Sequence, residues 1–99
     1  MPTLTWSPNL PPIVMDPDDI RDFEFDFTAW LNGDEVDGAG CSALAEGCTA
    51  AVSATTANTA TLRVTGPGTA GTSGSATLRL ATINGRQSDR SLRLKFQEQ

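Results

Sequence analysis

Carboxylates are the side chains that come closest to offering chemistry in this 99-residue sequence. Glu24 and Asp26 stand two positions apart in an alternating stretch, which places both on one face of a strand. Paired carboxylates can act as acid and base, but a solvated strand face provides nothing that would raise a pKa. The sequence contains no histidine and no tyrosine, so the usual general base is missing. We therefore predict that the protein is not an enzyme and has no catalytic residues.

Metal chemistry is not expected either. The acidic stretch at residues 16–19, Asp-Pro-Asp-Asp, lacks the glycine and the distal glutamate of a calcium loop and is typical of a turn. Cys41 and Cys48 lie seven positions apart, without a histidine or a second cysteine pair, which argues against zinc. We expect them to be small buried thiols, with a disulfide across a hairpin as the alternative. The sequence thus predicts neither a metal nor a cofactor.

Residues 22–31 organise the predicted fold, because they contain four of the six aromatic side chains of the chain. Apolar and polar positions alternate there, which favours a strand with one buried face. The positions expected to face the core are Phe23, Phe25, Phe27, Ala29 and Leu31. A helix is the alternative, because apolar residues from Ile20 to Leu31 also recur at helical spacing.

Short strands separated by turn residues are predicted for the rest of the chain. After a hairpin at Asn32-Gly33, the expected strands run from Val36 toward Cys41 and over residues 49–53, 60–65, 76–82 and 91–96. Loops or turns are expected at 44–47, 55–58 and 66–74, with a second hairpin at Asn84-Gly85. This spacing is typical of an all-β fold, and we predict a small antiparallel immunoglobulin-like β-sandwich with an extended N-terminal arm.

The arm is predicted to span residues 1–15 and the sandwich domain residues 16–99. Prolines at positions 2, 8, 11 and 12 impose extended backbone. The apolar side chains of Trp6, Ile13 and Val14 nevertheless predict that the arm docks on a surface. That surface is either an edge of the domain's own sheet or a neighbouring subunit.

Charge is distributed unevenly along the chain. Residues 1–50 contain ten acids and one base, a net charge of −9, whereas residues 51–99 contain two acids and six bases, a net charge of +4; together they give −5. This balance argues against nucleic acid as a partner. Either the two halves neutralise each other across paired strands, or an acidic face meets a basic face on another subunit. The strand pattern points Arg63, Arg79, Arg93 and Lys95 outward.

A membrane partner and a secretory route are also not expected. No apolar run is long enough to span a bilayer. The first residues lack the basic stretch and apolar core of a secretory signal, so synthesis in the cytoplasm is predicted.

Several motifs appear in an order that resembles a family of small bacteriophage virion proteins, the fibre–tail adaptor proteins. These motifs are Asp16-Pro17-Asp18-Asp19-Ile20, residues 22–31 with a following Gly33-Asp34, residues 68–73, Asn84-Gly85-Arg86 and Asp89-Arg90-Ser91-Leu92. The sequence departs from the family pattern at three positions. It has Cys41 where an aromatic residue is expected, Gly74 where a tyrosine is expected, and Phe27 where tryptophan is common.

The resemblance implies a structural protein of the virion that joins tail and fibre components in several symmetric copies. It implies no catalytic residues. Alternatives are a capsid decoration or head–tail joining protein and, from another class, a module that binds cell-surface carbohydrate. The expected partners are other virion proteins and copies of the chain itself, with neither nucleic acid nor membrane. The residues predicted to contact partners are Trp6, Ile13, Val14, Trp30, Arg63, Arg79 and Arg93.

Overall fold

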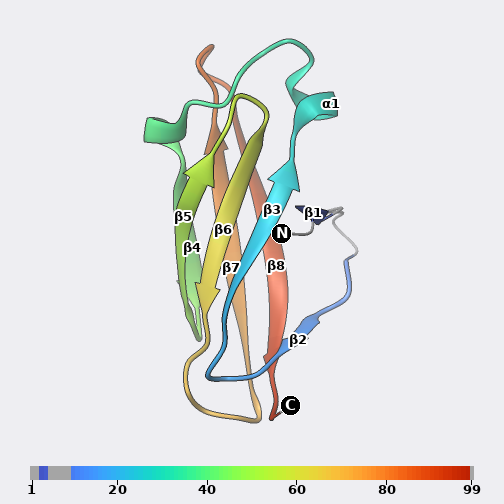
Figure 1. The fold of residues 1–99 in the computed structure, drawn as a ribbon, viewed down its shortest axis with the longest axis vertical. Helices are drawn as coiled ribbons and strands as arrows, with labels where there is room; N and C mark the ends of the chain where they lie inside the picture. The colour runs from blue at the N-terminus through green and yellow to red at the C-terminus, as the bar shows by residue number, and fades with distance from the viewer. Residues whose placement is uncertain (1–2, 5–9, 99) are drawn as a thin grey trace.

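Two four-stranded β-sheets packed face to face make up the computed structural model, which describes residues 3–4 and 10–98 (Figure 1). Sheet A has the order β1-β3-β6-β5 and sheet B the order β2-β8-β7-β4. The strands are β1 (Thr3–Leu4), β2 (Ile13–Met15), β3 (Ile20–Asp26), β4 (Ser42–Glu46), β5 (Thr49–Thr55), β6 (Thr59–Thr65), β7 (Thr72–Ala81) and β8 (Gln87–Phe96). The helical segments are α1 (Thr28–Leu31) and the 3₁₀ turn η1 (Gly38–Gly40).

The strand order confirms the predicted fold class. The antiparallel strands β3-β6-β5 and β8-β7-β4 correspond to the B-E-D and G-F-C orders of an immunoglobulin sandwich. The N-terminal segment adds one short strand to each sheet, because β1 pairs in parallel with β3 and β2 pairs in parallel with β8. Residues 13–15 therefore cover an edge of the domain's own sheet.

The core lies between the sheets and follows the period of two that the sequence predicts. Phe23 and Phe25 of β3 pack beside the inner residues of β6 in the same sheet and against those of β7 and β8 in the other sheet. Those inner residues are Ala60, Leu62, Val64, Ala76, Leu78, Leu80, Leu92, Leu94 and Phe96, all buried. Each large apolar side chain buried in this way contributes about 1.5–3 kcal/mol relative to exposure. The predicted strands at 60–65, 76–82 and 91–96 and the hairpin at Asn84-Gly85 are thereby confirmed.

The strand predicted through residue 31 ends earlier, at Asp26. The Oδ1 atom of Asp26 accepts hydrogen bonds from the backbone N–H and the hydroxyl of Thr28, and the chain then turns into the four-residue helix α1. Phe27 and Leu31 stay buried, but Ala29 is exposed, so its predicted inward position was wrong. The long helix considered as the alternative was also wrong, because residues 20–26 are a strand.

The connection after α1 is not the predicted hairpin and strand. Asn32 adopts a left-handed conformation (φ 48°) that ends the helix, as residues at this position commonly do. Val36 then forms one isolated bridge with Thr82, and the 3₁₀ turn η1 follows. The prediction of a strand toward Cys41 was therefore wrong.

Strand β4 occupies most of the predicted loop at 44–47. Its alanines point inward and its remaining side chains outward, and it pairs with β7 from Ser42 to Glu46. Alanine and serine have low strand propensity, so pairing with β7 decides the conformation.

Both cysteines are free thiols and half-buried. Cys41 and Cys48 stand at opposite ends of β4, and five strand residues span about 17 Å. A disulfide requires Cα atoms less than about 7 Å apart, so the alternative of a bridge is excluded in this fold. Burial raises the pKa of the Cys48 thiol, which disfavours its thiolate.

Residues 16–19 form the predicted turn. The Asp16 carboxylate accepts the Asp18 N–H at 2.9 Å, and the Asp16 carbonyl accepts the Asp19 N–H at 3.0 Å. Pro17 in this turn is buried, and Met15 before it is 1% exposed and belongs to the core. The division between arm and domain at residue 15 remains a prediction.

Candidate interaction surfaces

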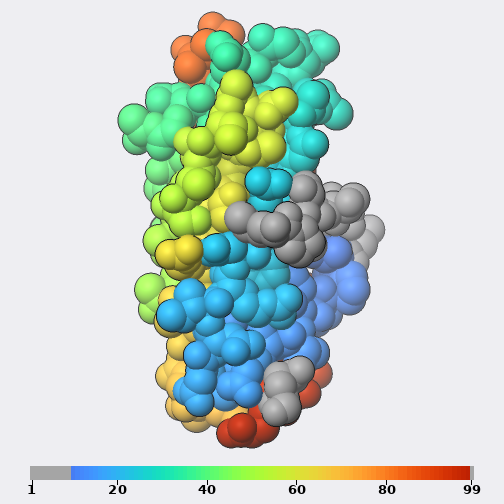
Figure 2. Space-filling model, viewed as in Figure 1, coloured from blue at the N-terminus to red at the C-terminus, as the bar shows by residue number. Residues whose placement is uncertain are grey.

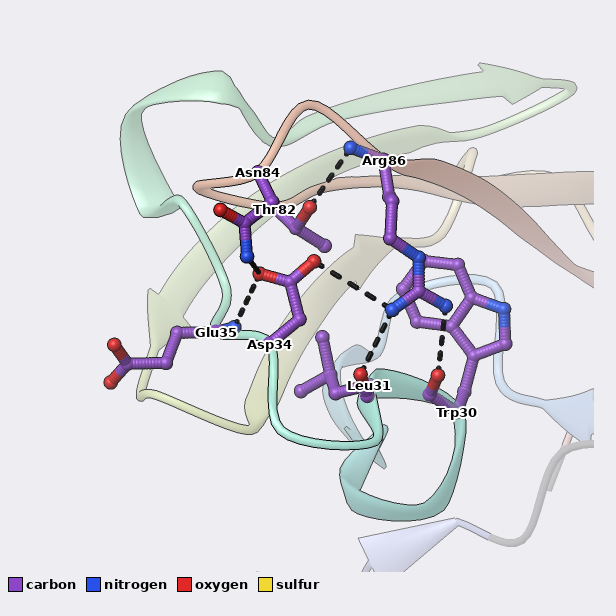
Figure 3. A network of polar contacts seen from close by, with 7 residues as sticks. All are labelled: Trp30, Leu31, Asp34, Glu35, Thr82, Asn84 and Arg86. Carbon is purple, nitrogen blue, oxygen red and sulfur yellow. Dashed lines mark hydrogen bonds and ion pairs between the residues drawn. The ribbon is translucent and has the colours of Figure 1, made fainter.

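The β3–β4 connection meets the β7–β8 hairpin at one end of the sandwich (Figure 1). We call residues 27–41 together with residues 82–86 the loop end. The 16–19 turn and the 66–71 loop lie at the opposite end (Figure 1). A network of polar contacts joins the two segments of the loop end (Figure 3).

Arg86 connects the hairpin to α1. Its Nη1 donates to the Leu31 carbonyl at 2.8 Å and its Nη2 to the Trp30 carbonyl at 2.9 Å. These carbonyls lie at the C-terminal end of a helix, where no partner within the helix is available. The guanidinium carbon also lies 4.1 Å from the centre of the Trp30 ring. One side chain thus fixes both the backbone and the aromatic side chain of α1.

Asp34 is the buried acid of this network, with a side chain that is only 5% exposed. Its Oδ1 accepts the Glu35 N–H at 2.8 Å and the Asn84 side-chain amide at 2.9 Å. Its Oδ2 has only the ion pair with Arg86 Nη1 at 3.6 Å and no well-formed hydrogen bond. Burial acts to raise the Asp34 pKa, but the polar groups of Thr82, Glu35 and Asn84 and the charge of Arg86 lower it overall.

The hairpin tip is held in place by its backbone. The Ile83 N–H donates to the Glu35 carbonyl at 3.0 Å, and the Arg86 N–H donates to the Thr82 hydroxyl at 2.9 Å. The side chain of Ile83 is nevertheless 60% exposed. The loop end therefore presents an apolar side chain on a backbone that is already ordered.

We expect stability to fall in acid because four aspartates have lowered pKa values. These are Asp22, Asp26, Asp34 and Asp89. Protonation favours the unfolded state, so their contribution is present at neutral pH and is lost as the pH falls below the ordinary aspartate value of 3.8. The urea midpoint should be clearly lower at pH 3 than at pH 7, and Asp34→Asn should reduce that difference. An equal midpoint at both pH values would contradict this account of the carboxylates.

Arginines predicted to contact partners lie on both sheets rather than in one row. Arg63 of β6 pairs with Asp22 at 2.8 Å on sheet A, and Arg79 of β7 pairs with Asp89 at 3.0 Å on sheet B. The Asp22–Arg63 and Asp34–Arg86 pairs join the acidic and basic halves of the chain, which confirms internal neutralisation for these residues. The Arg63–Asp22 and Arg79–Asp89 pairs are exposed, and such pairs contribute little to stability, whereas the Asp34 carboxylate is buried.

The remaining predicted contact residues are spread around the domain. Arg93 donates to the Leu10 carbonyl at 2.7 Å and so helps to hold the arm. Ile13 packs against the core, whereas Val14 is 41% exposed. Trp30 packs edge-on against Phe27, with ring centres 6.3 Å apart. Trp6 lies outside the described residues.

Of the residues in the polar network, sequence reasoning selected only Trp30 as a contact residue. Asp34 and Arg86 nevertheless belong to the motifs Gly33-Asp34 and Asn84-Gly85-Arg86, on which the resemblance partly rests. The structure brings these two motifs into direct contact through the Asn84–Asp34 hydrogen bond, across 50 positions of sequence. Within residues 3–4 and 10–98, no three acidic, cysteine or histidine side chains are placed so that they could hold a metal ion.

The comparison with known families tests the resemblance found in the sequence. The family model of Podophage GP4 fiber-tail adaptor protein gp77 matches residues 15–95, which is well over half of the chain. The chain belongs to this family. No curated protein and no solved structure matched the chain. The predicted resemblance is thus confirmed, and membership implies a structural role in a phage particle and no enzymatic one. No helix in the described part of the chain is long and apolar enough to cross a membrane.

Proposed function

We propose that this chain joins a tail component to a fibre component of a phage particle through protein–protein contacts and catalyses no reaction. The observation that carries the proposal is the adaptor family match over residues 15–95, which includes β3 to β7 and nearly all of β8. The proposed partners are other virion proteins and further copies of the chain, without nucleic acid or membrane. Its proposed location is the virion, after synthesis in the host cytoplasm.

The loop end is proposed as one contact surface. Arg86, Asp34 and Asn84 fix its backbone before any partner binds, so little conformational entropy is lost on association. Ile83 offers an exposed apolar group for a pocket on the partner, and Glu35 beside it is exposed and acidic. These features suit a partner surface with an apolar pocket and basic groups at its rim.

The arm, residues 1–15, is proposed as a second contact. Val14 is exposed at the edge of sheet B, and its neighbour Ile13 is only half-buried. Contact with a neighbouring protein would cover both side chains. Trp6 is proposed to contribute to the same surface.

The alternative functions differ in the surfaces that they require. A capsid decoration or head–tail joining protein would need the same surfaces and differs only in its position in the particle. A carbohydrate-binding module would need an exposed aromatic face for stacking on sugar rings. The guanidinium of Arg86 lies over the Trp30 ring at 4.1 Å, which disfavours that use of Trp30.

Addition of the purified protein to particles assembled without it tests the proposal. We expect such particles to lack fibres and the wild-type protein to restore them. Ile83→Asp should restore few fibres, because it places a charge at the proposed apolar contact. The matched control is Ile20→Asp, which changes an isoleucine that is 64% exposed on β3, and it should restore fibres fully.

Both variants should keep the unfolding temperature of the wild type, because both side chains are exposed. Fibres on particles that lack the chain would contradict the adaptor role. Full restoration by Ile83→Asp would show that the loop end is not a contact surface, but it would not contradict the adaptor role.

A further inference from the structure

One row of outward side chains on sheet B runs from an acid on β4, through a neutral residue on β7, to a base on β8. Strand register aligns Glu46 of β4 with Ser75 of β7, and Ser75 with Arg93 of β8. The neighbouring outward row contains Leu44, Thr77 and Ser91 in the same strand order. These two rows place the small side chains of Ser75 and Thr77 at the centre, which permits close approach of another flat surface there. The next row contains Arg79 and Asp89, whose charges neutralise each other within one copy.

A shallow groove of about 290 Å³ lies at the acidic end of this face. It is lined by Leu44, Ala45, Glu46, Ser75 and Thr77. Leu44 is 52% exposed and supplies an apolar wall, whereas Glu46 supplies a carboxylate. This combination suits a lysine or arginine, whose methylene stem packs on apolar surface while its charged head meets a carboxylate.

Basic side chains of this kind stand at the other end of the same face. Arg93 and Lys95 of β8 are both exposed and point outward. When two copies meet face to face about a two-fold axis parallel to the strands, the acidic end of each lies over the basic end of the other. The contact is then made twice, as in any symmetric interface.

We propose that the outer face of sheet B is a self-complementary interface, in which each copy places a basic side chain of β8 in the groove beside Glu46 of the other. The proposal rests on the proposed assembly in several copies and names the surface that mediates it. Opposite charges on the two ends give both attraction and a defined orientation.

The outer face of sheet A does not have this arrangement. Strand β3 presents Asp22, Glu24 and Asp26 there, and the base of β6, Arg63, is paired with Asp22 within the same copy. Two such faces would repel each other, because acidic groups would meet acidic groups. Charge complementarity therefore selects sheet B.

Analytical ultracentrifugation of the full chain over a range of concentrations, with a reducing agent present, tests the interface. We expect a dimer that weakens in 1 M NaCl, because salt screens exposed charges. Glu46→Lys and Lys95→Glu should each weaken the dimer about tenfold, since each substitution alters two symmetric contacts. The combination of both should restore it. Lys95 is chosen because Arg93 also holds the arm through Leu10.

Glu35→Lys is the matched control, because it reverses an exposed acidic charge at the loop end and should leave the dimer unchanged. A chain that stays monomeric, a dimer that neither reversal weakens, or a double variant that fails to dimerise would each overturn the proposal. These outcomes are measured without the virion, so they leave the fibre-restoration test of the adaptor role unaffected.

Discussion

Phe27→Ala is expected to lower the free energy of unfolding by about 4 kcal/mol, because it removes a large ring from a filled site. The side chain is 1% exposed and packs against Phe25 and Trp30, with ring centres 6.2 and 6.3 Å away. The guanidinium carbon of Arg90 lies 5.0 Å from its ring centre. The residue also stands where β3 becomes α1, and its carbonyl accepts the Leu31 N–H at 2.8 Å. Loss of the ring should therefore loosen both the core and the loop end.

Urea denaturation followed by tryptophan fluorescence measures this loss. A domain of this size has a total stability of about 5–15 kcal/mol, so the variant should lose between about a quarter and most of it. Ile20→Ala on β3 is the control, because its side chain is 64% exposed, and it should change the stability by less than about 0.5 kcal/mol. Equal effects of the two substitutions would contradict the assignment of Phe27 to the core.

Gly66→Ala is expected to cost about 3 kcal/mol, because the added methyl group has no space. A Cβ atom at this position would clash with the carbonyl oxygen of Pro17, which is backbone and cannot rotate away. The two segments are also joined by hydrogen bonds of 2.9 Å from the Gly66 N–H to the Asp19 carbonyl and from the Gly68 N–H to the Pro17 carbonyl. The substitution should therefore separate the 16–19 turn from the loop after β6.

Gly38→Ala provides the control for this prediction. A Cβ atom at Gly38 would meet chiefly the hydroxyl of Thr55, which can move by rotation of its side chain. Thermal unfolding should show a much larger decrease for Gly66→Ala than for Gly38→Ala. A similar small decrease for both would show that the turn at 16–19 is free to move away from Gly66.

Strands with strict alternation were predictable from the sequence. These strands have alanine, leucine, valine or phenylalanine at every second position over residues 60–64, 76–80 and 92–96, and burial of one face is enough to select a strand. Strand β4 was not predictable, because its alanines and serine have no strand preference of their own. Its conformation comes from pairing with β7, about thirty positions later in the chain.

Residues 27–31 show how a local contact can override a correct pattern. Alternation continues through this segment, but the Asp26 carboxylate binds the N–H and the hydroxyl of Thr28 and starts a helical turn. Phe27 and Leu31 reach the core under either conformation, because positions four apart share one face of a helix and one face of a strand. Ala29 distinguishes the two conformations, because the strand pattern predicted it inward and the helix exposes it.

The polar network at the loop end could not be derived from spacing in the sequence. Arg86 donates a hydrogen bond to the carbonyl of Leu31, which lies 55 positions earlier in the chain. This carbonyl can accept the bond only because α1 ends there. The motifs Gly33-Asp34 and Asn84-Gly85-Arg86 contributed to the resemblance, but nothing in either motif specifies the other as its partner. Topology brings them together, because the B–C and F–G connections of an immunoglobulin sandwich lie at the same end.

Figure 2 shows the outer face of sheet A, to which β3, β5 and β6 belong. The loop end and the outer face of sheet B are separate surfaces from this one. A single small domain can therefore contact a virion protein at its end and a second copy at its side. That separation is what a structural adaptor requires.

Electron microscopy of intact particles, reconstructed to a resolution that separates β-strands, tests the central claim most directly. The account predicts density for this two-sheet domain at the junction of tail and fibre, with the loop end around Ile83 and Arg86 against a neighbouring protein. Density for the domain on the capsid surface, or particles with complete tail–fibre junctions that do not contain the chain, would contradict it.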